Sequence, residues 1–349
     1  MITSFCFVAG GSGGHSVPCL TIAYNYQQQY PDAQCIFFTS SRTLDQKIAK
    51  EYTWLSQIQH LRLTSFPGWR LWRYPSFFWL IGTAFVKAYT ILRTEKPRKL
   101  ISLGGFVSVP VCLAAALLRI PIELYELNAV PGKAVRLLAL FAQRIFICFE
   151  QAQNNLPSEK CIFAPYPIRF SNVLSLSSKK LLAPVKNLTL LIVGGSQGSA
   201  FINSAIKKWL SLPNRLSIPF TIIHQTGAQH LDDMQRFYAD AGIDAHVFDY
   251  HHQLESFYQQ ADIVVCRAGA GTLFELLFFN KQCITIPLED CADNHQYANA
   301  IALAQKYPEL VSVVRQHELQ KDPELLDCAL RLKLFHDGQP SGFEPNPNT

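Results

Sequence analysis

The sequence predicts an α/β protein of two doubly wound domains, each built on a parallel sheet. The first observation is that short strand-like runs alternate with helix-like segments through most of the chain, a pattern typical of βαβ units. The second is that 349 residues are long for one domain and sufficient for two. The third is a weak internal repeat, because FVAGGSGGH near the start and LIVGGSQGS in the middle both combine a strand, a double glycine, a serine and a helix.

The expected strands are short apolar runs, and helical patterns lie between them. In the first half the strands are Ser4–Ala9, Gln34–Thr39, Lys99–Leu103, Ile122–Glu126 and Arg144–Phe149. Two helical patterns cover Val107–Leu118 and Lys133–Ala142. The alternation resumes in the second half with Leu188–Val193, Phe220–His224, Ala245–Phe248, Ala261–Cys266 and Gln282–Pro287.

A polar, proline-containing region over Gln151–Val185 separates the two halves. We therefore expect an N-terminal domain over 1–160, an inter-domain linker over 161–185 and a C-terminal domain over 186–335. Residues 336–349 are rich in Pro, Gly and Asn, and we expect them to form a disordered tail. Two such domains in tandem would bring two strand-to-helix turns to one cleft, where the ligands of parallel sheets bind.

The composition argues against several classes of protein. A formal net charge of +5 is too small for general nucleic-acid binding. Many of the cysteines, such as Cys6, Cys112, Cys148, Cys266 and Cys283, lie inside apolar runs, and no C-x-x-C motif occurs. We therefore expect a reducing compartment, without disulfides or a zinc site.

No signal peptide is expected, because the N-terminus lacks a basic region and its apolar stretch runs into a glycine loop. The longest apolar segment, Phe77–Val86, has about half the ~20 residues that a membrane-spanning helix needs. We therefore expect a chain that lies on a membrane at most.

The glycine loop Gly10–His15 follows an expected strand and precedes an expected helix. Glycines permit positive φ and close backbone approach, and a helix N-terminus supplies free N–H groups with partial positive charge. The loop suits a phosphate or a developing anion, although a tight turn without a ligand would use the same residues. A second loop in a matching place, Gly194–Gly198, favours the functional interpretation.

A dinucleotide site is disfavoured, because its fingerprint is G-x-G-x-x-G, whereas Gly11 and Gly13 are followed by Ser16. The second strand also ends in Thr39-Ser40-Ser41, without the acid that would bind a ribose. A P-loop is excluded because no G-K-[ST] follows either loop.

His15 ends the first glycine loop. A histidine at that position could act as a general base near neutral pH. Helix capping or another structural role is the alternative.

Further motifs follow in order along the chain: LGGFVSVP at Leu103–Pro110, ELNAVPGKA at Glu126–Ala134, VGGSQGS at Val193–Ser199, CRAGAGTLFE at Cys266–Glu275 and ADNHQYANA at Ala292–Ala300. Together with GGSGGH at Gly10–His15, they resemble the motifs of the MurG family. Its members are the UDP-N-acetylglucosamine:N-acetylmuramyl-(pentapeptide)-pyrophosphoryl-undecaprenol N-acetylglucosaminyltransferases of peptidoglycan synthesis. The resemblance runs from residue 5 to about residue 315.

The resemblance implies a GT-B fold, in which two Rossmann-like domains with parallel sheets face a central cleft. It implies an inverting transfer of GlcNAc from UDP-GlcNAc to the C4 hydroxyl of MurNAc on undecaprenyl-linked lipid I, giving lipid II for cell wall biogenesis, cell shape and cell division. The acceptor would bind mainly the N-terminal domain and the donor mainly the C-terminal domain. The enzyme would be peripheral, at the anionic cytoplasmic face of the plasma membrane, with other cell-wall enzymes as candidate partners and no nucleic acid.

The resemblance also assigns roles to individual residues. Glu275 would accept hydrogen bonds from the ribose hydroxyls, because a carboxylate can accept from two vicinal donors. Arg169 and Ser196 would contact the diphosphate, and Asn128 and Gln296 would hold sugar hydroxyls. The remaining implied substrate-binding residues are Ser12, Gly13 and Gly14 in the first loop, Ala270, Gly271, Thr272, Leu273 and Phe274 at a helix N-terminus, and His251, through a backbone group at the uracil.

The catalytic base has two candidates, His15 and Glu126. For Glu126 a buried structural carboxylate is an equal alternative. One departure from the family lies next to it, because the family has His where this chain has Tyr125. A tyrosine is a poor base at neutral pH, so Tyr125 affects the expected rate or specificity.

Residues Phe66–Val86 combine arginines with many aromatic side chains, among them Trp69, Trp72, Arg70 and Arg73. Aromatic rings favour the headgroup level of a bilayer, and arginines meet anionic lipids. We expect this stretch to dock on the membrane; a core helix with a capping loop is the alternative.

Three other functions remain open. The chain could be a related UDP-sugar-dependent lipid glycosyltransferase, such as a diacylglycerol glycosyltransferase, or a UDP-sugar epimerase of the same two-domain fold. It could also be a weakly active or inactive UDP-sugar-binding scaffold, for which Tyr125 is the only support. No Asp-x-Asp motif stands out, so we expect no metal ligands and no required cofactor, with Mg²⁺ at most accessory.

Overall fold

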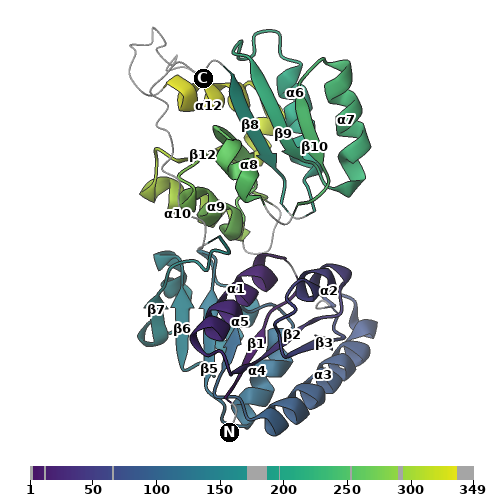
Figure 1. Ribbon diagram of the computed structural model, residues 1–349, viewed down its shortest axis with the longest axis vertical. Helices are drawn as coiled ribbons and strands as arrows, with labels where there is room; N and C mark the ends of the chain where they lie inside the picture. The colour runs from purple at the N-terminus through teal and green to yellow at the C-terminus, as the bar shows by residue number, and fades with distance from the viewer. Residues whose placement is uncertain are drawn as a thin grey trace. The chain divides into compact units, whose positions relative to one another are not determined.

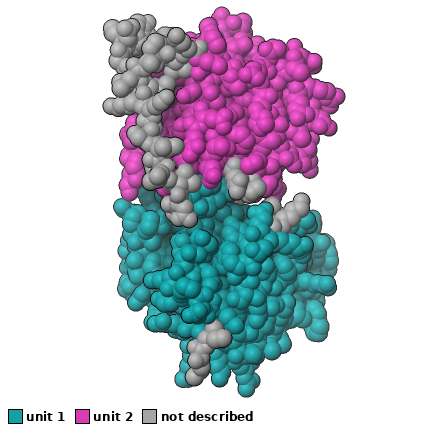
Figure 2. Space-filling model, viewed as in Figure 1, with its two compact units in different colours: residues 1–174, 269–275, 290–302 teal, residues 175–268, 276–289, 303–349 magenta. Residues whose placement is uncertain are grey.

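The structure is a computed structural model that describes residues 3–11, 13–64, 67–170, 187–195, 197–251, 254–289 and 294–335. The chain divides into two compact units (Figure 2). Unit 1 comprises residues 1–174, 269–275 and 290–302, and unit 2 comprises residues 175–268, 276–289 and 303–349. Each unit contains one parallel sheet, so the predicted α/β class is confirmed. The expected tail over 336–349 lies outside the described residues.

Unit 1 is built on a seven-stranded sheet with the order β3-β2-β1-β4-β5-β6-β7, in which every neighbouring pair is parallel (Figure 1). Its strands are β1 (Ser4–Val8), β2 (Gln34–Ser40), β3 (Gln57–Leu61), β4 (Leu100–Ser102), β5 (Ile122–Glu126), β6 (Arg144–Ile147) and β7 (Cys161–Phe163). Its helices are α1 (Gly13–Gln29), α2 (Thr43–Lys50), η1 (Leu71–Arg73), α3 (Tyr74–Glu95), α4 (Ser108–Leu117), α5 (Lys133–Leu138), η2 (Glu150–Asn155) and η3 (Ser158–Lys160).

Both faces of this sheet are covered, which explains why every residue of β1 is buried. Successive side chains of a strand point to opposite faces. Phe5 and Phe7 meet the ring of Tyr26 on α1, with ring centroids 5.0 and 5.7 Å apart. Cys6 and Val8 belong to the core that α3, α4 and α5 form on the other face. The strand therefore ends with its glycine loop fixed between two layers of helices.

Unit 2 is built on a six-stranded parallel sheet with the order β10-β9-β8-β11-β12-β13. Its strands are β8 (Leu188–Val193), β9 (Phe220–Gln225), β10 (Ala245–Phe248), β11 (Ile263–Cys266), β12 (Gln282–Thr285) and β13 (Val311–Val313). Its helices are α6 (Ala200–Leu210), η4 (Ala228–His230), α7 (Leu231–Asp240), α8 (Glu255–Gln260), α11 (Gln316–Lys321) and α12 (Glu324–Phe335). Two more helices, α9 (Ala270–Phe278) and α10 (His295–Lys306), begin in unit 1 and end in unit 2.

A polar network lies inside unit 2 around His224, which is fully buried on β9. Its Nδ1 lies 2.7 Å from the hydroxyl of Tyr238, and its Nε2 lies 3.1 Å from Oδ1 of Asn203. Asn203 donates its Nδ2 hydrogen to the carbonyl of Thr226, so its Oδ1 must accept from His224. Burial lowers the pKa of His224 to about 3, so the imidazole is neutral at pH 7.

Three strands were not predicted from the sequence: β3, β7 and β13. All three lie at sheet edges, where a strand buries less apolar surface and its sequence is less distinctive. β7, at Cys161–Phe163, lies in the region expected to be linker, and segments 269–275 and 290–302 belong to unit 1. The domain boundaries at 160 and 185 stay predictions.

Helix α3 is longer than the apolar run Phe77–Val86 suggests, and by length and composition alone it could cross a membrane. Its buried residues, Ala84, Ala88 and Leu92, belong to the core of unit 1. Insertion into a bilayer would remove them from that core. We therefore interpret α3 as a surface helix. The alternative of a core helix is wrong, because most of its side chains are exposed or only partly buried.

Candidate active site

The first glycine loop is held by a carboxylate from α2. Oδ2 of Asp45 accepts a hydrogen bond from the N–H of Gly11 at 2.8 Å, and Oδ1 accepts one from the hydroxyl of Ser16 at 3.0 Å. Ser40, at the end of β2, also donates to Oδ2. Asp45 is buried, and bonds to an ionised acceptor are the stronger kind. The loop therefore has a fixed geometry.

The two glycine motifs of unit 1 meet where Gly105 approaches Gly10. Gly105 has a φ of +79°, and a Cβ at this position would lie 2.7 Å from the carbonyl oxygen of Gly10, so only glycine fits. Arg42 covers the same loop. Its Nη1 donates to the carbonyl of Gly11 at 3.1 Å, and its guanidinium lies 5.1 Å from the ring centroid of Phe106.

His15 is placed in the first turn of α1. Its side chain is partly exposed, but its Nδ1 is buried and has no hydrogen-bond partner among the residues that the structure describes. Burial lowers the pKa of His15 below the ordinary 6.5, and the nearby His295 lowers it further. The Leu103 backbone and the charge of Asp45 oppose this shift without cancelling it. The ring is neutral at pH 7 and can accept a proton.

Glu126, the other candidate base, is occupied by backbone groups. Its Oε1 accepts from the backbone N–H of Asn128 at 2.9 Å and from its Nδ2 at 3.1 Å, and its Oε2 accepts from the N–H of Gly132 at 3.0 Å. Burial raises the pKa of Glu126, although these bonds oppose the shift. The arrangement is that of a structural carboxylate which orders the turn after β5. It fits a base poorly, because both oxygens are already acceptors.

Tyr125, which stands where the family has a histidine, lies in an aromatic stack. Its ring is 4.6 Å from that of Phe146, with an angle of 24° between the planes. Burial raises the pKa of Tyr125, so the phenol stays protonated at neutral pH. Along β5 it points to the opposite face from Glu126.

The N-terminus of α9 is covered by a segment that follows β7. The hydroxyl of Tyr166 would lie 3.1 Å from a Cβ at Gly271, and the Tyr166 ring stacks on Phe274 with centroids 4.9 Å apart. Phe149 meets Phe274 edge-on at 5.2 Å. The segment therefore runs along the first turns of α9, the end of a helix that favours an anion.

Arg169, on the same segment, is paired with Glu275 of α9. Its Nε donates to Oε1 of Glu275 at 2.9 Å. The guanidinium also lies 4.6 Å from the ring centroid of Phe170. Glu275 is buried. Two residues that the sequence assigns to different parts of the nucleotide therefore contact each other.

The second glycine loop, in unit 2, leads into α6. A Cβ at Gly198 would collide with the carbonyl of Thr226, so close packing alone explains why this residue is a glycine. Ser199 caps α6, because its Oγ accepts from the N–H of Ile202 at 3.3 Å, and Arg267 donates to the same Oγ at 3.1 Å. The start of α6 is thus held in place by side-chain contacts.

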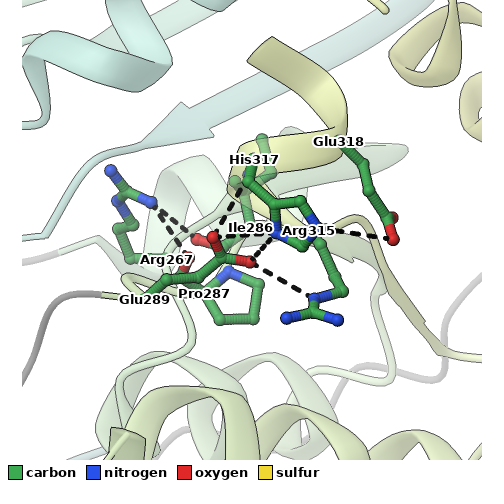
Figure 3. Close-up of polar contacts among 7 residues, drawn as sticks. All are labelled: Arg267, Ile286, Pro287, Glu289, Arg315, His317 and Glu318. Carbon is green, nitrogen blue, oxygen red and sulfur yellow. Dashed lines mark hydrogen bonds and ion pairs between the residues drawn. The ribbon is translucent and has the colours of Figure 1, made fainter. Parts of the chain in front are cut away.

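Two charged side chains fasten the turn after β12 in unit 2 (Figure 3). Arg267 donates from Nη1 to the carbonyls of Ile286 at 3.0 Å and Pro287 at 3.3 Å. Glu289 points toward α11 and accepts from Nδ1 of His317 at 2.8 Å and from Nε of Arg315 at 3.3 Å. Burial raises the pKa of Glu289, but the bonds from His317 and Arg315 outweigh it and hold the pKa below its ordinary value. This turn precedes the ADNHQYANA motif in the sequence.

The predicted substrate residues of α9 are of two kinds. Ala270 and Leu273 are buried, and Phe274 is stacked on Tyr166. Their side chains serve packing, which leaves only backbone groups for a ligand. Thr272 is partly exposed, and its side chain is accessible.

The other predicted residues differ in where they lie. Unit 1 contains Gly13, Gly14, His15, Glu126, Asn128, Arg169, residues 270–275 and Gln296. His251 lies in unit 2, where its ring packs edge-on against Phe257 with centroids 5.4 Å apart. Ser12 and Ser196 lie outside the described residues.

Within the described ranges, no group of three or more His, Cys, Asp or Glu side chains could hold a metal ion. Asp290 and Asp293 lie outside those ranges. The expectation that no metal or cofactor is required stays a prediction.

Two residues of this region, Asp45 and Asn299, were not predicted from the sequence. An acid was expected at the end of β2 for a ribose-binding site, whereas Asp45 lies in the first turn of the following helix. Asn299 is fully buried on α10 and bonds to Asn128. The only sequence signal for it is its position one turn after Gln296 on the same helix.

These features define a two-domain glycosyltransferase. The N-terminal domain of glycosyltransferase family 28 matches residues 5–147, and the C-terminal domain of the same family matches residues 189–338. The predicted GT-B fold is thereby confirmed.

A named relative makes the assignment particular. The UDP-N-acetylglucosamine--N-acetylmuramyl-(pentapeptide) pyrophosphoryl-undecaprenol N-acetylglucosamine transferase of Desulfotalea psychrophila is 32% identical, over 83% of this chain and 78% of its own length. The crystal structure of Acinetobacter baumannii MurG superposes with a TM-score of 0.71 at 26% identity, covering 95% of this chain and 91% of that one. The chain belongs to the MurG family of glycosyltransferases.

A more distant neighbour shares the fold alone. The UDP-GlcNAc 2-epimerase from Neisseria meningitidis superposes with a TM-score of 0.58 at 14% identity, covering 97% of this chain and 95% of that one. This likeness carries no argument for epimerase activity.

Proposed function

We propose that the chain transfers GlcNAc from UDP-GlcNAc to the C4 hydroxyl of MurNAc on undecaprenyl-linked lipid I, giving lipid II. The observation that carries the proposal is that one compact unit holds both a neutral His15 and the Arg169–Glu275 pair at the start of α9. A base for the acceptor hydroxyl and a site for the leaving nucleotide are the two requirements of an inverting transfer.

His15 is the base in this mechanism. The C4 oxygen of the acceptor attacks the anomeric carbon of GlcNAc as the bond between that carbon and the diphosphate oxygen breaks. The hydroxyl proton passes to a ring nitrogen of His15, and both electrons of the broken bond leave with UDP. The lowered pKa of His15 keeps it unprotonated before the step.

UDP is stabilised by fixed dipoles and by one cation. The N–H groups at the start of α9 point along the helix axis toward the leaving diphosphate. Arg169 supplies positive charge, and Glu275 accepts from the ribose hydroxyls. Ser196, known from the sequence alone, would add a contact to the diphosphate. Mg²⁺ is at most accessory, and a full rate in the presence of EDTA would support this.

Attachment to the membrane is also proposed, through η1 and the start of α3. Trp69, Trp72 and Trp79 are 78%, 69% and 73% exposed. Clustered exposed apolar side chains are typical of an interaction surface, whereas scattered single ones are common on any protein. Trp69 packs edge-on against Trp72 at 6.0 Å, and Arg70 lies 5.6 Å from the Trp69 ring. An aromatic patch with arginines suits the cytoplasmic face of the plasma membrane, which is anionic.

The test is an assay with UDP-GlcNAc and three acceptors: a lipid I analogue, diacylglycerol and none. Lipid II formed only with lipid I supports the proposal. Transfer to diacylglycerol would favour a different lipid glycosyltransferase, and conversion of UDP-GlcNAc without acceptor would favour an epimerase. UDP binding without any turnover would leave a sugar-nucleotide-binding scaffold.

A further inference from the structure

Asn299 on α10 is a buried carboxamide that contacts the turn after β5. It is 0% exposed. Its Oδ1 accepts from the backbone N–H of Ala129 at 2.8 Å, and its Nδ2 donates to Oδ1 of Asn128 at 3.1 Å. All three residues belong to unit 1.

Asn128 is held from its other end by Glu126. Its Nδ2 donates to Oε1 of Glu126 at 3.1 Å, and its backbone N–H donates to the same oxygen at 2.9 Å. Glu126 is itself fixed by the N–H of Gly132. The contacts thus form a chain from Asn299 through Asn128 to Glu126.

The backbone N–H of Ala129 decides which atoms donate and which accept along this series of hydrogen bonds. The N–H of Ala129 can only donate, so Oδ1 of Asn299 must face it and Nδ2 must face Asn128. Oδ1 of Asn128 then accepts, which turns its Nδ2 toward the carboxylate of Glu126. The amide of Asn128, although partly exposed, therefore has one orientation.

The same residue also places Gln296. Gln296 and Asn299 are three residues apart on α10, so they lie on one face of the helix. The contact that fastens Asn299 to Asn128 therefore also ties the turn of α10 that carries Gln296 to the turn after β5. These are the two side chains expected to hold sugar hydroxyls.

We propose that Asn299 is a positioning residue for sugar recognition, and that Glu126 serves the same purpose from the other end of the chain of contacts. This inference rests on the proposed function, because it assumes that Asn128 and Gln296 contact sugars. In this proposal Asn299 contacts neither the donor nor the acceptor. It determines sugar specificity by holding the side chains that contact the sugar.

The first experiment compares donors that differ at one hydroxyl. We expect Asn299→Ala to lower kcat/KM for UDP-GlcNAc roughly 10-fold, as for the loss of one well-made buried hydrogen bond. The preference for UDP-GlcNAc over UDP-GalNAc, its C4 epimer, should fall by a similar factor. Affinity for UDP, which carries no sugar, should stay within about twofold of wild type. Equal losses for both donors would overturn the proposal, because they indicate a general structural defect.

The second experiment is a double-mutant cycle on kcat/KM with Asn299→Ala, Asn128→Ala and the double variant. If Asn299 acts through Asn128, the double variant should resemble Asn128→Ala alone. Additive effects would overturn the proposal. Asn25→Ala, at an exposed asparagine of α1, is the matched control and should leave all rates unchanged.

The two levels of hypothesis fail separately. Wild-type protein that makes no lipid II refutes the proposed function. Wild-type protein that makes lipid II while Asn299→Ala behaves like it refutes the role of Asn299 only.

Discussion

Arg169 donates its Nε hydrogen to Oε1 of Glu275 across 2.9 Å, and both side chains are largely shielded from solvent. A carboxylate that accepts from an arginine is held in a fixed direction. In the proposed site, Glu275 would therefore be preorganised as an acceptor before a nucleotide arrives. Arg169 has a second consequence for binding, because it brings positive charge to the N-terminal turns of α9.

The first prediction concerns ribose recognition by Glu275. Glu275→Ala should weaken UDP binding roughly 10-fold, since hydrogen bonds to a charged acceptor are lost. Wild type should bind UDP more tightly than 2′-deoxy-UDP, and the variant should bind both equally. Isothermal titration calorimetry with the two nucleotides measures this.

A matched control for that pair is Lys207–Asp233, an exposed ion pair at 2.8 Å in unit 2. Asp233→Ala should leave both affinities unchanged. Continued discrimination against 2′-deoxy-UDP by Glu275→Ala would show that another group reads the ribose.

The second prediction concerns the base. His15→Ala should lower kcat by roughly 10²- to 10⁴-fold, while UDP affinity stays near that of wild type. Because burial and His295 lower the pKa of His15, the unprotonated form prevails above that pKa. The kcat/KM of the wild-type enzyme should therefore stay constant as the pH falls to 6.5 and decline only below pH 6.5.

The pH profile of lipid II formation tests this, with His230→Ala as the control for a histidine remote in sequence. A decline that begins well above pH 6.5, or full activity in His15→Ala, would remove His15 as the base. Glu126 would not replace it, because both its oxygens accept backbone hydrogens.

The local parts of the site could be predicted from the sequence, because the chemistry is contained in short motifs. The motif Gly10–His15 predicts the start of a helix after a strand, and α1 does begin within it, at Gly13. The order of motifs also predicted the fold. Short edge strands such as β7 (CIF) were missed, since so few residues carry no recognisable period.

The contacts that complete the site could not be predicted, because they join residues far apart in the sequence. Asp45 holds Gly11 from 34 residues away, and Arg169 meets Glu275 from 106 residues away. Glu126 illustrates a further difficulty. Its sequence context allowed a base or a structural acid, and only the positions of the Asn128 and Gly132 amides favour the structural role.

The third prediction concerns stability against acid. The pKa of His224 is lowered to about 3 by burial, whereas the unfolded chain has a histidine pKa near 6.5. Between these values the unfolded state binds more protons, so stability falls as the pH drops below 6.5, with a slope approaching about 1.4 kcal/mol per pH unit. Stability from this group is fully present above pH 6.5.

Urea unfolding at pH 7, 6 and 5 measures that slope. His224→Gln should be less stable at pH 7 but should show a shallower loss between pH 7 and 5. His246→Gln, at an exposed histidine on the neighbouring strand β10, should keep the wild-type slope. An unchanged slope in His224→Gln would mean that other groups dominate acid unfolding.

The fourth prediction concerns the aromatic patch of η1 and α3. Trp72→Ala or Trp79→Ala should each reduce pelleting with phosphatidylglycerol vesicles roughly 10-fold, because each loses the burial of one large aromatic side chain. Arg73→Gln should weaken pelleting mainly at low salt, where attraction to anionic lipid is least screened.

Phe335→Ala, which removes a 59% exposed aromatic ring from α12, is the matched control and should pellet like wild type. Because Ala84, Ala88 and Leu92 hold α3 on the core, these variants should fold and bind UDP normally. Equal pelleting by all variants would place membrane attachment elsewhere on the chain.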